Sequence, residues 1–174
     1  AVIVVLIITN PKARGHWQVH FLDVGQGNAA IVIKNSHAII VDTGDVLDNG
    51  HSIASRVIVP FLDYYRINQV DFIVVTHDDN DHSGGFEFLT KRFPQAGFIS
   101  NQSSLSGINT ALCDGKLKWQ GLVVKLIKVP DGVVKSDNNR SCLIHISDGK
   151  HSVLFTGDIQ KRAERYFSQQ LDST

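Results

Sequence analysis

Six consecutive residues, 77–82, carry two histidines and three aspartates directly after an apolar run. Residues 71–75 (DFIVV) have the length and character of a short buried strand, and Gly84 and Gly85 lead into a segment with helical spacing. Such a dense group of ionisable side chains is costly unless something binds it. We therefore expect the cluster on a loop at the carboxyl end of a strand, where α/β folds usually place their chemistry.

The composition fits one globular domain. With 174 residues, 43% of them hydrophobic, the chain is long enough for one core and too short for two comfortable ones. Its 17 basic and 17 acidic residues cancel, which removes the bulk electrostatic signature of a nucleic-acid binder. A metal site can supply local positive charge, so a nucleic-acid substrate is not excluded.

The amino-terminal segment differs in character from the rest. Its first nine residues are almost wholly apolar, whereas a membrane-spanning helix needs about 20 such residues. Residues 1–15 fit either the stub of a membrane helix or a leader, and residues 16–174 are expected to form the folded domain. A cleavable signal peptide is disfavoured because no basic stretch precedes the apolar one.

Apolar periodicity predicts strands, a helix, a strand, a helix, more strands and a final helix. Asn35-Ser36 is a hairpin signal, Pro60 predicts a kink or split in the first helix, and the polar residues 101–110 are typical of a loop. The order implies sheets sandwiched between helices, a four-layer α/β arrangement. The expected strands cover residues 17–22, 29–34, 37–41, 71–75, 98–99, 117–119, 122–129, 141–146 and 152–155, and the expected helices 52–67, 86–93 and 159–171.

The loop cluster has the residue types of a two-metal site. Alternate residues His77, Asp79 and Asp81 can project to one side of an extended segment, and His82 follows as a helix begins. Imidazole suits zinc, iron, nickel or manganese, and added carboxylates shift the preference toward harder ions. The alternative is a solvated loop that caps the next helix through Asp81 or Ser83. Capping explains one or two of these residues but not two histidines as well.

Three further segments offer polar groups next to strands. Asp158 follows an apolar run and a glycine and could bridge two metals, or simply cap the next helix. Asp42 has the same layout and fits either a partner of a ligating histidine or a turn former. The residues Asn138, Asn139 and Ser141 could hold a phosphate, complete a metal shell, or form a plain polar turn.

The other candidates are weaker. The other six histidines do not belong to such a dense group of ionisable residues and are expected to be surface or packed residues. No GxSxG nucleophile elbow occurs. Cys113 and Cys142 have no zinc-type spacing, so they are either one disulfide or two buried thiols.

These residues together resemble the metallo-β-lactamase superfamily, whose HxHxDH loop follows a strand. Here the loop is HxDxDH, with Asp79 in the place of the second histidine. More narrowly, the chain resembles the C-terminal domain of ComEC-type DNA-uptake channel proteins. That resemblance rests on HFLDVGQGN (20–28), IIVDTG (39–44), VPFL (59–62), THDDNDHSGG (76–85), NNRS (138–141) and LFTGD (154–158).

The resemblance implies an αββα sandwich over residues 16–174. It implies two divalent metal ions, with His77 and Asp79 on one, Asp81 and His82 on the other, and Asp158 between them. Asp81 would also act in catalysis by orienting the attacking hydroxide. The oxygen-rich set favours Mn²⁺, with Zn²⁺ possible. The superfamily fold continues beyond the length of this chain and normally adds a distal histidine, so we expect a C-terminally truncated domain with an incomplete site.

The family further implies a metal-dependent hydrolase, a nuclease that degrades the non-imported DNA strand during transformation. Its partners would be single-stranded DNA, the rest of a polytopic membrane channel and other DNA-uptake (competence) machinery. The location would be the bacterial inner membrane with this domain extracytoplasmic, which suits a Cys113–Cys142 disulfide. The alternatives are a small-molecule ester, lactone or thioester hydrolase of the same superfamily, and a domain that binds DNA without cutting it.

Overall fold

A computed structural model describes residues 15–47, 51–130, 132 and 140–171 of the chain. The predicted leader, apart from Gly15, and the candidate residues Asn138 and Asn139 lie outside the described residues. Within the described ranges, no helix is both long enough and apolar enough to cross a bilayer.

The first sheet has six strands in the order β1-β2-β3-β4-β5-β8. The hairpin predicted at Asn35-Ser36 is confirmed, since β1, β2 and β3 pair antiparallel, and from β3 onward neighbouring strands are parallel. The hairpin between β2 and β3 turns through Asn35 and Ser36, which have φ of 51° and 65°. The strands are β1 (Gln18–Phe21), β2 (Ala30–Lys34), β3 (His37–Val41), β4 (Gln69–Val75), β5 (Gly97–Ser100) and β8 (Ala111–Leu112).

The second sheet has four antiparallel strands in the order β12-β11-β10-β9. They are β9 (Gly115–Trp119), β10 (Leu122–Ile127), β11 (Leu143–Ser147) and β12 (Ser152–Phe155).

The expectation of a plain loop over residues 101–110 was wrong. A small hairpin forms there from β6 (Ser104–Leu105) and β7 (Ile108–Asn109). Ser106 and Gly107 both adopt positive φ at its turn. Leu105 is buried in the helix-side core, and this burial holds a polar sequence in strand pairing.

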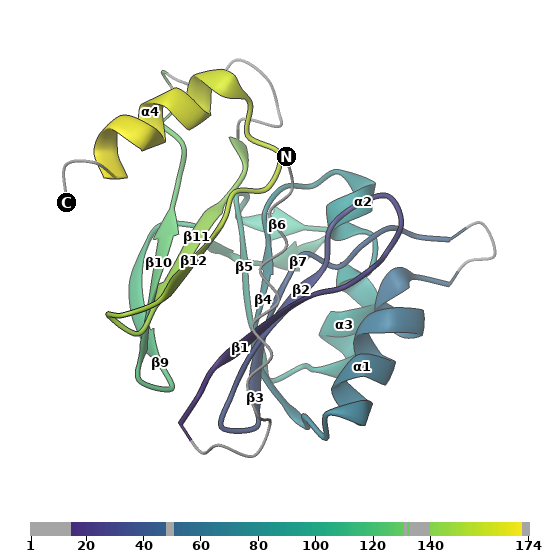
Figure 1. Cartoon of the computed structure of the whole chain (residues 1–174). Helices are drawn as coiled ribbons and strands as arrows, with labels where there is room; N and C mark the ends of the chain where they lie inside the picture. The colour runs from purple at the N-terminus through teal and green to yellow at the C-terminus, as the bar shows by residue number, and fades with distance from the viewer. Residues whose placement is uncertain (1–14, 48–50, 131, 133–139, 172–174) are drawn as a thin grey trace.

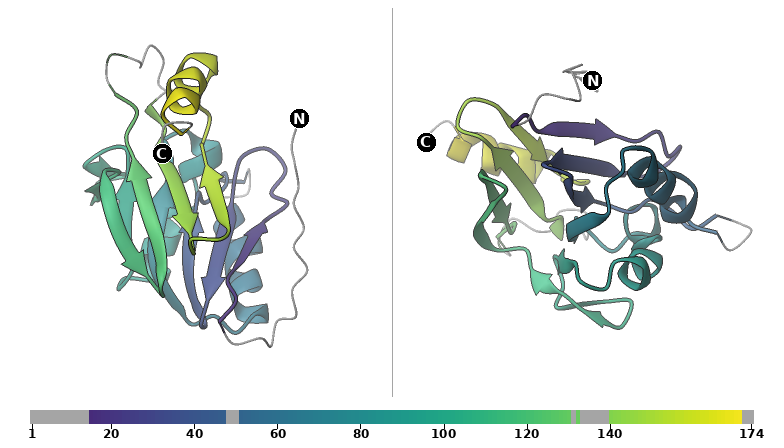
Figure 2. Two further views of the ribbon diagram at one scale, coloured as in Figure 1. Left: turned by 60° about the vertical axis from the view of Figure 1, so that its left-hand side comes forward. Right: turned by 90° about the horizontal axis from the view of Figure 1, so that it is seen from below.

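Helices cover the outer face of the first sheet, and the last helix lies across one end of the second sheet (Figures 1 and 2). The predicted first helix is split, as expected from Pro60, into a π-helical turn and an α-helix with Pro60 in its first turn. The N–H groups of a helix's first turn have no partner within the helix, so proline, which lacks an N–H, costs no hydrogen bond there. The helices are η1 (Ala54–Ile58), α1 (Val59–Tyr64), α2 (Asn80–Ser83), α3 (Phe86–Arg92) and α4 (Lys161–Leu171).

Three apolar clusters separate four layers. Ile31 and Ile40 point to the helix side of the first sheet, and their neighbours in β2 and β3 point into the core between the sheets. Both faces of the central strands are therefore buried, as parallel sheets require. Ala163 and Phe167 of α4 pack on Leu143 of the second sheet. The predicted four-layer α/β arrangement is confirmed.

Directional contacts also join the two sheets. Cys113 and Cys142 form a disulfide with their Cα atoms 5.6 Å apart, so the structure decides between the two alternatives left by the sequence. The indole Nε1 of Trp119 donates to Oδ2 of Asp71 at 2.6 Å. These contacts fix the register of one sheet over the other, which apolar packing alone does not specify.

The β2–β3 turn gives a test of the fold. Ser36 holds a left-handed conformation that costs a residue with a Cβ about 1 kcal/mol and costs glycine little. We therefore expect Ser36→Gly to raise the free energy of unfolding, by about 1 kcal/mol at most, in urea denaturation. Val153→Gly, in the interior of the second sheet's edge strand, should lower it. A lower stability for Ser36→Gly would contradict the turn geometry.

Candidate metal centre

The predicted ligand loop lies at the carboxyl end of β4. His77 follows the strand by two residues, Asp79 immediately precedes α2, and Asp81 and His82 lie within α2. Asp79 occupies the N-cap position, yet its side chain makes no capping hydrogen bond. Capping therefore does not account for this carboxylate.

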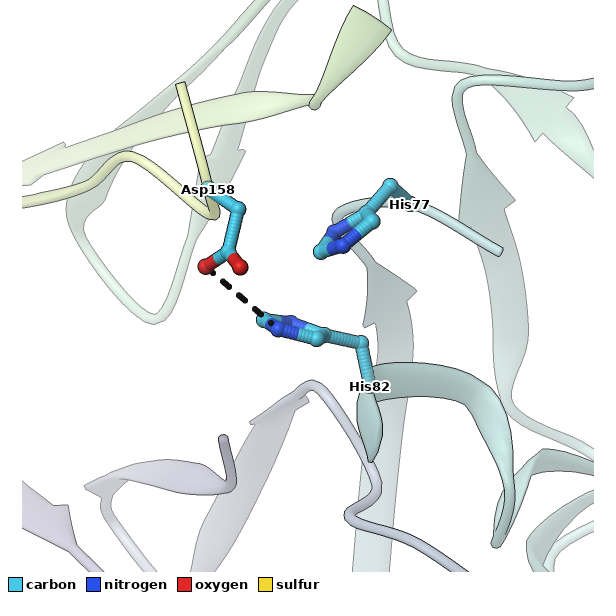
Figure 3. Close-up of side chains that lie close together, drawn as sticks. All are labelled: His77, His82 and Asp158. Atoms are coloured by element: carbon cyan, nitrogen blue, oxygen red, sulfur yellow. Dashed lines mark ion pairs between the residues drawn. The ribbon is translucent and has the colours of Figure 1, made fainter. Parts of the chain in front are cut away.

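The two histidines form the floor of the site and the carboxylates its rim. The His77 and His82 side chains are each only 1% exposed, and their ring centroids are 3.9 Å apart. The side chains of Asp79, Asp81 and Asp158 are 52%, 41% and 43% exposed. Figure 3 shows Asp158, from the end of the second sheet, pointing toward the two rings.

The distances define two overlapping groups of donors. Nε2 of His82 lies 3.5 Å from Oδ1 of Asp158 and 3.9 Å from Oδ2 of Asp81, and Nε2 of His77 lies 3.2 Å from Oδ2 of Asp79. Donor atoms within 4.8 Å of one another form the groups His77-His82-Asp158 and His77-Asp79-Asp81. The structure thus brings together all five predicted ligands and places His77 in both groups.

One atom in this site lacks a hydrogen-bond partner. Nε2 of His77 is buried and makes no hydrogen bond, even though Asp79 is near. An unpaired buried polar atom is costly, and a metal ion is a partner that neutral imidazole binds readily. The residues present therefore fit a divalent cation.

Asp42 orients the His82 ring through Nδ1, the ring nitrogen opposite Nε2. Its Oδ2 lies 2.8 Å from Nδ1 of His82 and accepts from the Thr76 hydroxyl at 2.9 Å, while its Oδ1 accepts from the Thr76 N–H at 2.7 Å. A proton on Nδ1 of His82 leaves Nε2 with a lone pair facing the carboxylates. Sequence reasoning singled out Asp42 as a candidate partner of a ligating histidine, and this is the contact it makes.

The local field favours positive charge. Burial lowers the pKa of His82, but the hydrogen bond that its ring donates to Asp42 and the negative charges of Asp42, Asp158 and Asp81 outweigh it, so the net shift is upward. A site that raises the pKa of a buried histidine stabilises a cation near it.

Several supporting residues were not identified from the sequence. Thr76 joins Asp42 to both histidines, with Oγ1 3.2 Å from Nδ1 of His77 and 3.3 Å from Nδ1 of His82. Thr43 donates its N–H and its hydroxyl to the His82 carbonyl oxygen at 2.7 and 2.9 Å. Threonine is common at strand ends, so only the position of each residue beside the aspartate or histidines could have drawn attention to it.

The GQG turn also supports the site. The N–H of Asn28 donates to the carbonyl oxygen of Asp81 at 3.1 Å, and a Cβ on Gly27 would lie 2.2 Å from that oxygen. Ser141, a candidate from the sequence, is buried, and its Oγ accepts from the Asp158 N–H at 3.3 Å. Among the described residues, the other six histidines belong to no metal-type group.

Known proteins resemble this chain in sequence and in fold. Residues 22–169 match the family model of the metallo-beta-lactamase superfamily. Recombination protein 2 of Haemophilus influenzae is 38% identical over 95% of this chain and 21% of its own length. Competence protein ComA of Neisseria gonorrhoeae is 28% identical over 82% of this chain and 20% of its own length. The crystal structure of the metallo-beta-lactamase fold protein YhfI from Bacillus subtilis aligns with a TM-score of 0.57 at 14% identity, over 83% of this chain and 64% of that one.

The chain belongs to the metallo-β-lactamase superfamily. Its relatives include competence proteins of the ComEC type, and it spans about one fifth of their length. Members of the superfamily are typically metal-dependent hydrolases, and the histidine and aspartate groups described above are those that would hold divalent ions here.

Asp42→Asn tests the role of the buried carboxylate. Asparagine tolerates the positive φ of 59° at this position, so the backbone is preserved. Its amide can turn an N–H toward Nδ1 of His82, which would move the histidine proton to Nε2 and block the metal-facing lone pair. We expect a loss of Mn²⁺ affinity of about 10- to 100-fold by calorimetry. An unchanged affinity would show that Asp42 does not set the tautomer.

The two glycines of the GQG turn provide a matched pair. Gly25 and Gly27 both have positive φ, but a Cβ on Gly25 meets nothing within 4 Å. Gly27→Ala should displace the Asp81 backbone and weaken Mn²⁺ binding, while Gly25→Ala should carry only the conformational cost of the turn. Calorimetry and urea denaturation on both variants separate the two effects. Equal metal affinities would mean that the contact with Asp81 is unimportant.

Proposed function

We propose that this chain is the metal-dependent nuclease domain of a DNA-uptake channel protein, acting on the DNA strand that is not imported during transformation. The main support for this proposal is the set of candidate metal ligands. Three carboxylates and two imidazoles form two overlapping groups of three, and the donor atoms of each group lie within 4.8 Å of one another.

The carboxylate of Asp79 is the feature that favours phosphodiester chemistry. It contributes an oxygen donor beside Nε2 of His77, where a histidine would make the site richer in nitrogen. Oxygen-rich sites prefer harder ions, so we propose Mn²⁺ as the resident metal, with Zn²⁺ possible. When bound, a pair of such ions neutralises charge on a phosphodiester oxygen and makes water a better nucleophile.

The residues of the chain divide the remaining work. His77 and His82 anchor the buried side of the site, and Asp42 fixes the orientation of the His82 ring. The carboxylates of Asp81 and Asp158 lie on the solvent side, where substrate and water arrive. We propose that Asp81 acts as the catalytic carboxylate that orients the attacking water and takes up its proton.

The relatives support a proposal for the cellular setting. Competence proteins among them support a partner set of single-stranded DNA, the remainder of a polytopic membrane channel and other DNA-uptake machinery. We propose a location at the bacterial inner membrane with this domain on the extracytoplasmic side. The disulfide between Cys113 and Cys142 is compatible with that compartment.

A cleavage assay tests the proposal. The protein is incubated with Mn²⁺ or Zn²⁺ and end-labelled single-stranded DNA, and in parallel with ester, lactone and thioester substrates. Metal-dependent cleavage of DNA is expected, with Asp81→Asn slower by about 100-fold or more.

Asp78→Asn is the matched control. Asp78 belongs to the same loop and also carries a carboxylate, but it accepts a hydrogen bond from Gln102 and lies outside both donor groups. This variant should cleave DNA at the wild-type rate. Hydrolysis of esters without DNA cleavage would replace the proposal by a small-molecule hydrolase. DNA binding without any cleavage would replace it by a binding domain.

A further inference from the structure

The metal centre is assembled from both sheets. His77 and His82 come from the loop that follows β4 of the first sheet, and Asp158 follows β12 of the second. Their donor atoms lie within 4.8 Å of one another. A small sliding of one sheet over the other would separate Asp158 from the histidines, and such sites need their ligands held within about 0.5 Å.

The disulfide crosses between the sheets at this end of the sandwich. Cys113 follows β8 of the first sheet, and its N–H donates to the Ser100 carbonyl oxygen at the end of β5 at 2.8 Å. Cys142 immediately precedes β11 of the second sheet, and its N–H donates to the Thr76 carbonyl oxygen at 2.7 Å. Cys142 is thus tied to the first sheet both by its sulfur and by its backbone.

A short chain of contacts runs from Cys142 to Asp158. Its neighbour Ser141 accepts the Asp158 N–H through Oγ at 3.3 Å. Gly157, just before Asp158, is packed so closely that a Cβ there would lie 2.9 Å from Oγ of Ser141 and from Cβ of Thr76. The position of Cys142 therefore fixes the backbone that presents the Asp158 carboxylate.

The cross-sheet hydrogen bonds that the two tryptophans donate lie at the other end of the sandwich. Trp119 donates to Asp71, which is five residues before Thr76 and so roughly 16 Å away along β4. Trp17 donates to Asp148 in the β11–β12 turn at 2.9 Å. These hydrogen bonds hold the opposite end of the sandwich and touch no metal ligand.

We propose that the Cys113–Cys142 disulfide is a positioning crosslink of the metal centre. It sets the separation of Asp158 from His82 and thereby the affinity for the ion held by His77, His82 and Asp158. The proposal rests on the metal binding that the proposed function requires, and it assigns to the disulfide a role beyond general stability.

The test compares Mn²⁺ affinities by calorimetry, at a temperature where urea denaturation shows every variant to be folded. Cys113→Ala/Cys142→Ala should bind Mn²⁺ roughly tenfold more weakly than wild type. Trp119→Phe removes a cross-sheet hydrogen bond at the far end and should bind as wild type does. Ser141→Ala keeps the disulfide but loses the contact with the Asp158 N–H, and it should weaken binding in the same direction.

Each outcome is informative. A wild-type protein that binds no Mn²⁺ or Zn²⁺ would sink the proposed function itself. Wild-type binding with an unchanged affinity in the double-cysteine variant would overturn the crosslink role and leave the metal site standing. Equal losses in that variant and in Trp119→Phe would reduce the disulfide to general stabilisation. Should the double-cysteine variant fail to fold, an unchanged affinity in Ser141→Ala overturns the proposal.

Discussion

The carboxylate of Asp42 is the interaction on which the centre of this structure depends. It is 2% exposed, so it is removed from water, and an unpaired carboxylate there would be prohibitively costly. Thr76 and His82 satisfy it with an N–H, a hydroxyl and an imidazole nitrogen. These three contacts join the end of β3 to the end of β4 and to the ligand loop. The geometry of the sheet therefore also determines the geometry of the site.

The packed layers bury the strands that carry the Asp42 contacts. Burial of β3 and β4 on both faces excludes water from their length and leaves only their carboxyl ends open to chemistry. The second sheet then brings Asp158 over that opening, and the Cys113–Cys142 disulfide and Thr76 carbonyl contact hold it there. The buried histidines and the exposed carboxylates follow from this placement at the seam between the sheets.

Local sequence signals were reliable where local physics decides. Asn35-Ser36 made the expected turn because both residues can take positive φ, and Pro60 split its helix because it lacks an N–H. They failed at residues 101–110, where the burial of Leu105 by a distant core formed a hairpin from a polar segment. The supporting threonines were missed for the same reason, since a threonine at a strand end carries no local mark of its partners.

The sequence by itself predicted most of the helices and strands, the four layers and the five side chains of the candidate metal centre, because periodicity, turn residues and ligand chemistry are properties of short segments. Only the tertiary structure decided that Cys113 and Cys142 are bonded, that His77 belongs to both donor groups, and that Gly27 and Thr43 brace the ligand loop. Each of these depends on distances between segments far apart in the chain. Such distances are set by how the sheets pack, which no short stretch of residues encodes alone.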